Sequence, residues 1–238
     1  NSARAIDMVL KAVRQGRLTQ PDIDTRVKKI LAAKYWLGLD TLQPVNLNGL
    51  YSDINRRQTA LLNQRLADAS VTLLKSDSLI KVLDYTKRTA IISVGVAQIS
   101  EFQDMLGWRF DNHMNYVLSP KATADDVAAV ANELSRYSQV IVAIHDDRIR
   151  PRSTLNYNGT VRLFLNELAA MNSVFCVFTN PYALAGLPGV EQAKSILVCY
   201  QNDDIMQRAA AKVILRQLTP SGKLPVTINA FFRYGDGK

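Results

Sequence analysis

The sequence predicts an α/β fold built around a mostly parallel β-sheet. From residue 89 onward, short runs rich in valine and isoleucine alternate with longer segments whose apolar residues recur every three or four positions. The predicted strands are residues 89–95, 113–118, 139–145, 174–179 and 195–200, and the predicted helices are residues 99–106, 124–137, 159–171 and 204–218. Strands that are apolar along their whole length are typical of a sheet covered by helices on both faces. Since crossovers are right-handed, we expect a doubly wound, three-layer sandwich of the flavodoxin-like kind.

A helical hairpin is predicted ahead of this sandwich. The apolar residues of segment 3–15 fall on one helical face, and Gly16 can end that helix. Thr19 is expected to cap a second helix, because the acidic residue Asp22 stands three positions further on. The second helix is expected to stop at Gly38.

The segment that follows the hairpin has the composition of a linker. Residues 40–56 are expected to run over a surface, since they show no apolar period and contain proline, glycine and asparagine. A helix over residues 57–70 and a strand over residues 71–75 then open the α/β part. The predicted organisation is therefore helices over 1–39, a linker over 40–56 and an α/β domain over 57–238.

Composition argues against several classes of protein. A chain of 238 residues that is 47% hydrophobic can bury a sizeable core, and no run of about 18 apolar residues predicts a membrane span. The net charge is +8, but the basic residues are dispersed, so we expect no nucleic-acid partner. Cys176 and Cys199 lie inside apolar runs and are expected to be buried free thiols, with a disulfide between neighbouring strands as the alternative. With His113 and His145 they show no zinc-site spacing, and no metal or cofactor is expected.

Polar residues cluster where the predicted strand 139–145 ends, and open parallel sheets bind ligands beyond the carboxyl ends of their strands. The candidate substrate-binding residues are His145, Asp146, Asp147, Arg148, Arg150, Asn156 and Asn158. A catalytic pair of His145 and Asp146 is disfavoured, because neighbouring strand residues point to opposite faces. A metal site that used these two residues and Asp147 would lack a fourth ligand. The alternative is a polar loop whose acids cap the next helix or pair with the arginines.

Two further strand ends are polar. Asn180 precedes a proline and predicts a turn, and Asp203 or Asp204 is expected to cap the last helix. The glycine-rich motifs that cradle phosphates are absent from the sequence, and Gly95 stands alone after its strand. A nucleotide-binding function is therefore disfavoured.

The end of the chain carries a more specific pattern. A proline and a glycine stop the last predicted helix, and the extended piece after them contains Pro225, which belongs at a sheet edge or outside the sheet. The motifs that carry a family resemblance are I-D-x-x-V-x-x-I-L-x-x-K at residues 23–34, A-S-V-T-L-L-K at 69–75, N-P-Y at 180–182 and P-S-G-K-L-P-V-T at 220–227. In this order they resemble the last barrel helices and the C-terminal α/β sandwich domain of glycoside hydrolase family 3.

This resemblance implies a retaining glycosidase, whose chemistry needs a carboxylate nucleophile and a nearby acid/base. In the family the nucleophile is an aspartate of the catalytic barrel, and residues 1–39 would be only the terminal helices of that barrel. The chain alone is therefore expected to be inactive. Its expected partners are the upstream barrel of the same polypeptide and a β-linked glycan, and the parent protein is expected in the periplasm or at the cell surface, with the cytoplasm as the alternative.

One departure from the family pattern separates its branches. The β-glucosidase-like branch places a glutamate acid/base in the loop that matches residues 146–158, and this loop contains no glutamate. The resemblance therefore favours the β-N-acetylglucosaminidase-like branch, which keeps its acid/base on the barrel and which residues 180–182 also resemble. We expect a non-catalytic domain that packs on the barrel and contributes loop 146–158 to glycan binding. The alternatives are the second domain of a β-glucosidase and a stand-alone flavodoxin-like binding or scaffold module.

Overall fold

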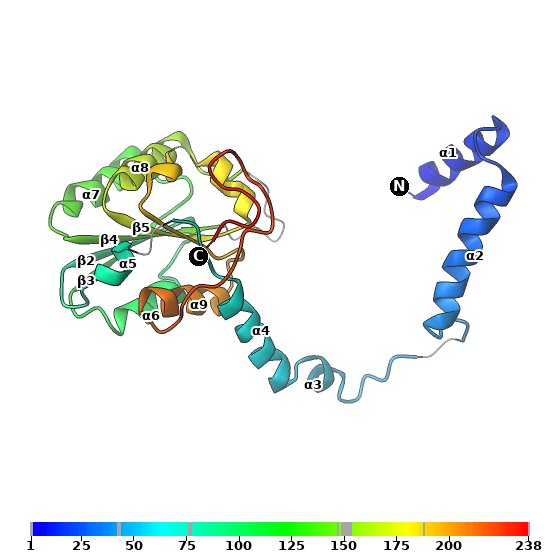
Figure 1. Cartoon of the computed structure of the whole chain (residues 1–238), viewed down its shortest axis with the longest axis horizontal. Helices are drawn as coiled ribbons and strands as arrows, with labels where there is room; N and C mark the ends of the chain where they lie inside the picture. Colours follow the sequence, from blue (N-terminus) through cyan, green and yellow to red (C-terminus); the bar gives the residue numbers. More distant parts are fainter. Residues whose placement is uncertain are drawn as a thin grey trace. The chain divides into compact units, whose positions relative to one another are not determined.

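The structure of the chain is a computed structural model that describes residues 2–41, 44–75, 78–146, 148, 154–187 and 189–237. The chain divides into two compact units, Asn1–Asn55 and Arg56–Lys238 (Figure 1).

The first unit is helical. It contains α1 (Ser2–Arg14), α2 (Gln20–Trp36) and the short α3 (Leu50–Ile54). The predicted cap of α2 is confirmed, since the Thr19 hydroxyl accepts from the Asp22 N–H and the Asp22 carboxylate accepts from the Thr19 N–H. α3 lies within the expected linker, residues 40–56, and this helix was not predicted. Five residues are too few to show a helical period.

The second unit is a six-stranded sheet with the strand order β1-β6-β5-β4-β2-β3. The strands are β1 (Thr72–Leu73), β2 (Thr89–Val94), β3 (His113–Leu118), β4 (Gln139–His145), β5 (Ser173–Phe178) and β6 (Ser195–Val198). All neighbouring pairs are parallel except β1 with β6. The predicted doubly wound, mostly parallel α/β fold is confirmed, although β1 is shorter than the expected strand over residues 71–75.

Helices cover both faces of the sheet (Figure 1). One face carries α4 (Arg57–Ser70), α5 (Ser78–Val82), α6 (Glu101–Gly107) and α9 (Asp204–Ile214), and the other carries α7 (Ala124–Leu134) and α8 (Gly159–Ala170). The 3-10 turns η1 (Pro181–Gly186) and η2 (Val190–Gln192) join β5 to β6. The apolar pattern of the sequence does not predict α5, η1 or η2, because each is too short to repeat an apolar period.

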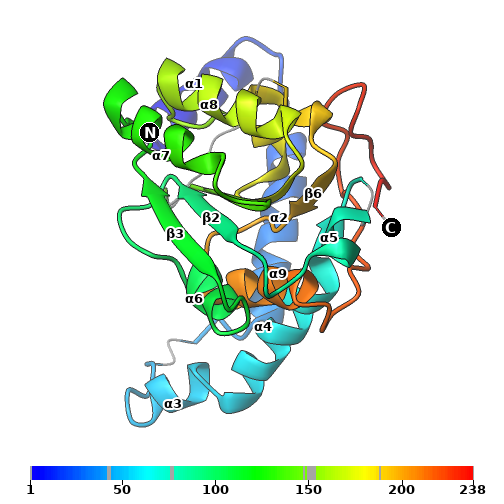
Figure 2. The ribbon, with the colours of Figure 1, turned by 90° about the vertical axis from the view of Figure 1, so that its left-hand side faces the viewer.

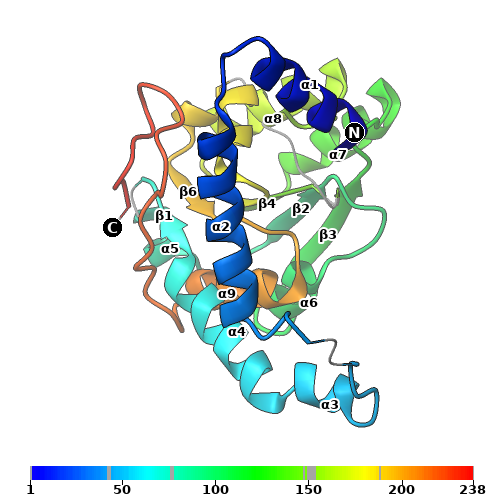
Figure 3. The same ribbon diagram turned by 90° about the vertical axis from the view of Figure 1, so that its right-hand side faces the viewer.

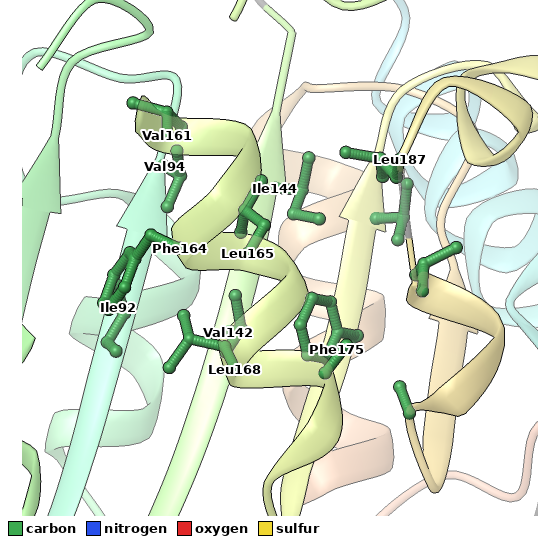
Figure 4. Packing of buried hydrophobic residues seen from close by; sticks show 14 of the residues in the cluster. Ile92, Val94, Val142, Ile144, Val161, Phe164, Leu165, Leu168, Phe175 and Leu187 are labelled. Atoms are coloured by element: carbon green, nitrogen blue, oxygen red, sulfur yellow. The ribbon is translucent and has the colours of Figure 1, made fainter. Parts of the chain in front are cut away.

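The α8 face illustrates how the core is built (Figure 4). Phe164 and Leu168 point from α8 onto the sheet, where they meet the residues of β2 and β4 that face this side, such as Ile92 and Val142. All four side chains are at most 2% exposed. Burying an aliphatic or aromatic side chain of this size contributes about 1.5–3 kcal/mol, so this layer holds the central strands rigidly.

The sheet has a topological switch point between β2 and β4. From β2 the chain crosses to β3 through α6, whereas from β4 it crosses to β5 through α8 on the other face. The connections of the adjacent strands β2 and β4 therefore leave the sheet toward opposite faces. In open α/β sheets, ligands bind at this switch point beyond the carboxyl ends of the strands.

The C-terminal segment 219–237 covers the β1 edge (Figure 3). The Gly222 N–H donates to Val71 O at 3.1 Å, and the segment folds back on itself where the Leu224 N–H donates to Asp236 O at 2.7 Å. Phe232 anchors it in the core at 2% exposure. The extended piece around Pro225 thus lies outside the sheet, which was one of the two predicted placements.

This close approach predicts that Gly222→Ala destabilises the second unit. A Cβ at this position would overlap Ser70 O and lie 2.5 Å from Thr72 Oγ1. We expect a loss of roughly 1–3 kcal/mol in the free energy of unfolding, measured by urea denaturation. Gly159→Ala is the matched control, since nothing lies within 4 Å of its Cβ, and it should be neutral or slightly stabilising. Equal stability of the two variants would contradict the packing described here.

Candidate functional site

The predicted site residues lie at the carboxyl edge of the sheet, in and after β4. His145 is the last residue of β4, Asp146 and Arg148 follow it, and Asn156 and Asn158 precede α8. Asp147 and Arg150 fall outside the residues that the structure describes. The described candidates separate into a buried histidine, an ion pair and a helix cap.

His145 is fully buried in a polar network on the α6 and α9 side of the sheet. Its Nδ1 lies 2.8 Å from Asn202 Oδ1, and its Nε2 lies 3.3 Å from Ser93 Oγ. Because an amide oxygen can only accept, Nδ1 carries the proton and Nε2 accepts from the Ser93 hydroxyl. The ring also stacks on Phe178, with centroids 4.9 Å apart. His145 therefore contacts protein on all sides, and its exposed fraction is 0%.

The network continues into the helices that flank β4. Asn202 Oδ1 also accepts from Gln207 Nε2 at 3.0 Å, and Gln207 Oε1 accepts from the Phe102 N–H at 3.1 Å. Ser93 Oγ lies 3.2 Å from the hydroxyl of Ser100, the cap of α6. These bonds connect β2 and β4 with α6 and α9. Asn202 and Gln207 were not among the candidate site residues. Asn202 lies in the polar stretch after the predicted strand 195–200, which was interpreted as the cap of the last helix.

Burial controls the protonation of His145. Loss of solvent disfavours the imidazolium and outweighs the hydrogen bond to Asn202, which favours it, so the pKa of His145 falls to about 4. The ring is therefore neutral near neutral pH. A neutral, inaccessible imidazole cannot exchange protons with a ligand at the surface.

Asp146 and Arg148 form an ion pair at the start of the loop. Arg148 Nε donates to Asp146 Oδ1 at 2.7 Å and Arg148 Nη2 to Asp146 Oδ2 at 2.6 Å, and Nη2 also donates to Thr154 O at 2.8 Å. The carboxylate side chain is 4% exposed and the arginine side chain is 31% exposed. Burial alone would raise the pKa of Asp146, but the hydrogen bonds and charge of Arg148 offset it, and the net pKa is lowered. Asp146 is thus a paired carboxylate.

The Tyr157 hydroxyl lies at the switch point, between the ends of β2 and β4. It lies 2.8 Å from Val94 O and 2.6 Å from His145 O, so its proton is shared by carbonyls of β2 and β4. Gly95 permits this approach, since it has a φ of +99° and a Cβ there would overlap both His145 O and the Tyr157 hydroxyl. Tyr157 is 8% exposed. The position that holds nucleotides in many folds of this class is therefore filled by a side chain.

The end of the loop is held by structural contacts. Asn158 caps α8, because its Oδ1 accepts from the Val161 N–H at 2.9 Å while its Nδ2 donates to Ala122 O at 2.8 Å. The Arg162 guanidinium donates to the backbone oxygens of Leu155, Tyr157 and Gly186. Asn156 is exposed. Sequence analysis missed Arg162, since an arginine within an amphipathic helix gives no sign of which loop it holds.

Other predictions can be compared directly with the structure. Asp203 caps α9 and accepts from the Met206 N–H, as one of the two predicted caps. Cys176 and Cys199 are free and buried, as expected. Within the described ranges, no three His, Cys, Asp or Glu side chains gather as ligands for a metal ion. Over the same ranges, no helix has the length and apolar character that a bilayer span requires.

Known proteins resemble this chain over most of its length, although no protein-family model matches it. It is similar to a putative β-xylosidase of Formosa agariphila, with 22% identity over 233 aligned positions that cover 87% of this chain and 31% of that protein. A glycoside hydrolase family 3 β-N-acetylglucosaminidase from Paenibacillus sp. str. FPU-7 matches with a TM-score of 0.64 and 23% identity, over 94% of this chain and 43% of that one. A β-glucosidase from Listeria innocua matches with a TM-score of 0.63 and 17% identity, over 92% of this chain and 34% of that one.

The chain has the fold of a family 3 C-terminal domain. The resemblance predicted from the sequence motifs is thus confirmed at the level of the fold. The chain spans less than half the length of each of these proteins. The shared fold accounts for the order of helices and strands in this chain. The names of the similar proteins give different activities, namely β-xylosidase, β-N-acetylglucosaminidase and β-glucosidase.

The buried histidine predicts a specific acid sensitivity of the second unit. The pKa of His145 is about 4 in the folded chain and about 6.5 when unfolded, so protons favour unfolding between these values. The resulting stability is complete above about pH 6.5 and is lost as the pH falls toward 4, by about 3 kcal/mol in total. Urea unfolding of the wild type and His145→Gln between about pH 7 and pH 4 measures this contribution.

His145→Gln should be less stable near neutral pH but should lose less stability on acidification. Gln207→Ala is the control, because it disrupts the same network without removing a titrating group. It should be less stable throughout and should keep the wild-type pH dependence. The same acid sensitivity in all three proteins would show that His145 does not cause it.

Proposed function

We propose that this chain is the C-terminal α/β domain, with the preceding barrel helices, of a family 3 glycoside hydrolase. The observation that carries the proposal is the likeness to family 3 structure over 94% of the chain, together with motifs that occur in family order. The first unit adds support, since apolar side chains such as Ile6, Leu10 and Ile30 are 47–60% exposed. Helices with such surfaces belong against a larger apolar core, which a catalytic barrel would supply.

The domain supports bond cleavage and does not perform it. Retaining cleavage of a glycoside needs a carboxylate nucleophile and an acid/base close to it. In the described part of the carboxyl edge, the carboxylate of Asp146 is bound by Arg148, and His145 is inaccessible. Both catalytic groups are therefore assigned to the barrel of the longer polypeptide.

The substrate is assigned to the β-N-acetylglucosaminide class. Loop 146–158 lacks the glutamate that the β-glucosidase-like branch uses, and residues 180–182 read Asn-Pro-Tyr. The similarity to the Paenibacillus β-N-acetylglucosaminidase supports this assignment. The β-glucosidase and β-xylosidase names of the other similar proteins define the competing substrates.

Loop 146–158 is the proposed contribution of this domain to glycan binding. Arg148 presents a partly exposed guanidinium that Asp146 and Thr154 O hold in place. A fixed donor of this kind can bind sugar hydroxyl or acetamido oxygens without first losing side-chain entropy. Asn156 adds an exposed amide. His145 and Asp146 then act by holding the strand end and the arginine.

Hydrolysis of chromogenic β-glycosides tests the assignment. The panel contains the N-acetylglucosaminide, glucoside and xyloside, and the proteins are this chain and the longer polypeptide with the barrel. We expect activity in the longer polypeptide only, with preference for the N-acetylglucosaminide. Activity of the 238-residue chain alone would contradict the non-catalytic role, and preference for the glucoside or xyloside would contradict the substrate class.

Arg148→Ala in the longer polypeptide tests the role of the loop. Losing one charge-assisted hydrogen bond to the glycan should raise KM about tenfold and leave kcat nearly unchanged. Arg150→Ala tests the neighbouring candidate in the same way. Arg136→Ala is the matched control, since this exposed arginine pairs with Glu133 on α7. Unchanged KM in both loop variants, with wild-type melting temperatures, would remove the loop from glycan binding.

A further inference from the structure

β3 is an open edge of the sheet. It is last in the strand order and pairs with β2 alone (Figure 2). At the two ends of this pairing, the N–H groups of Thr89 and Gly95 donate to the carbonyl oxygens of Asn112 and Leu118. In a parallel ladder, alternate residues direct both of their backbone groups to the same neighbour. The even-numbered residues of β3 therefore bond to β2.

The backbone N–H and C=O groups of the odd-numbered residues of β3 point away from β2. The N–H and C=O groups of His113, Asn115 and Val117 form a row of donors and acceptors along this edge. Within the described residues, β3 has a strand neighbour on one side only. The opposite edge of the sheet, at β1, is covered by the C-terminal segment that Gly222 joins to Val71. The β1 edge is therefore covered by a segment of the same chain, whereas β3 has no strand on its outer side among the described residues.

The β3 strand itself carries none of the residues that usually prevent an edge strand from pairing. Natural proteins guard open edges with charged residues, prolines or bulges, and the β3 sequence H-M-N-Y-V-L has no charged residue and no proline. It pairs with β2 in unbroken register over all six residues, so it has no bulge. The side chain of Met114 is also 52% exposed. This edge can accept another strand.

Asn115 lies at the centre of β3, and one of its side-chain atoms has no hydrogen-bond partner among the described residues. That atom is Oδ1, and it is buried. Asn115 is in register with Ile91, so its side chain lies on the α6 face of the sheet. Leaving a buried polar atom unpaired costs about 1–3 kcal/mol, which a partner at this edge would recover.

We propose that β3 is a homodimer interface in which two copies pair their β3 strands antiparallel around a two-fold axis at Asn115. In this register Asn115 stands opposite the partner's Asn115, and His113 stands opposite the partner's Val117. All three outward-facing residues then exchange both backbone hydrogen bonds with the other copy. Donors meet acceptors along the whole edge, and no like charges are brought together. A two-fold interface uses the same surface on both partners, and a second copy of this chain supplies it.

The same two-fold axis places a hydrogen-bond partner beside the Asn115 side-chain amide. Directly opposed residues of an antiparallel pair point to the same face, with Cβ atoms about 4.5–5.5 Å apart. The two Asn115 amides therefore meet and can bond to each other after rotation about χ2. A single strand pair buries less than a standard interface of about 1,600 Å², so we expect a reversible dimer with a Kd in the micromolar range.

Cross-linking tests the register. Asn115→Cys places two thiols across the axis with Cα atoms about 5.5 Å apart, within disulfide range. The native thiols of Cys176 and Cys199 are fully buried and do not compete. Under mild oxidation we expect a disulfide-linked dimer of the 238-residue chain. Asn172→Cys, at an exposed asparagine between α8 and β5, is the control and should give little. Equal cross-linking by the two variants would overturn the proposal.

Sedimentation equilibrium tests the association itself. We expect the wild type to pass from monomer to dimer as its concentration rises to about 100 μM. Asn115→Asp places like charges opposite each other and should weaken the dimer at least about tenfold, whereas Asn172→Asp should not. Thermal melting checks that each variant is folded. A wild type that stays monomeric throughout, or a dimer that Asn115→Asp leaves unchanged, would overturn the proposal.

Discussion

The fold of the second unit depends on how the strand-end carbonyls are satisfied where β2 and β4 part. The chain leaves these neighbouring strands toward opposite faces, so Val94 O and His145 O have no strand beyond them to pair with. The Tyr157 hydroxyl supplies their donor from loop 146–158, at 2.8 and 2.6 Å. A buried acceptor without a donor costs about 1–3 kcal/mol, so this contact ties the loop to the sheet. It also requires glycine at position 95, because any Cβ there would overlap both groups.

On the α6 and α9 face of the sheet, the same switch point is filled by side chains that hydrogen-bond to one another. Ser93 and His145 lie in β2 and β4, and Asn202 lies between β6 and α9; their hydrogen bonds reach the first turns of α6 and α9. Such a network is stabilising only when every member is paired, and it then fixes one arrangement. The α6 and α9 side of the switch point between β2 and β4 is therefore filled by paired side chains.

Sequence patterns predicted the repeating parts of this fold and missed the parts that depend on tertiary contact. β4 has the predicted bounds, since its run of apolar residues reflects burial on both faces. The capping box at Thr19 was also predicted, because it depends only on residues close together in the sequence. The short α5 and η1 have no period to detect. The candidate site shows the same division. His145 was predicted as a site residue from its position at the end of a strand. Its burial depends on contacts with Asn202 and Phe178, which lie 57 and 33 residues away in the sequence.

The two proposals about this chain are compatible in space, and this follows from strand direction. Antiparallel pairing of two β3 strands makes the β4 strands of the two copies run in opposite directions within one continuous sheet. The carboxyl edges of the copies then point away from each other. Each edge, with its own Arg148, remains free to face a catalytic barrel. Association at the β3 edge and glycan binding at the carboxyl edge therefore need not compete.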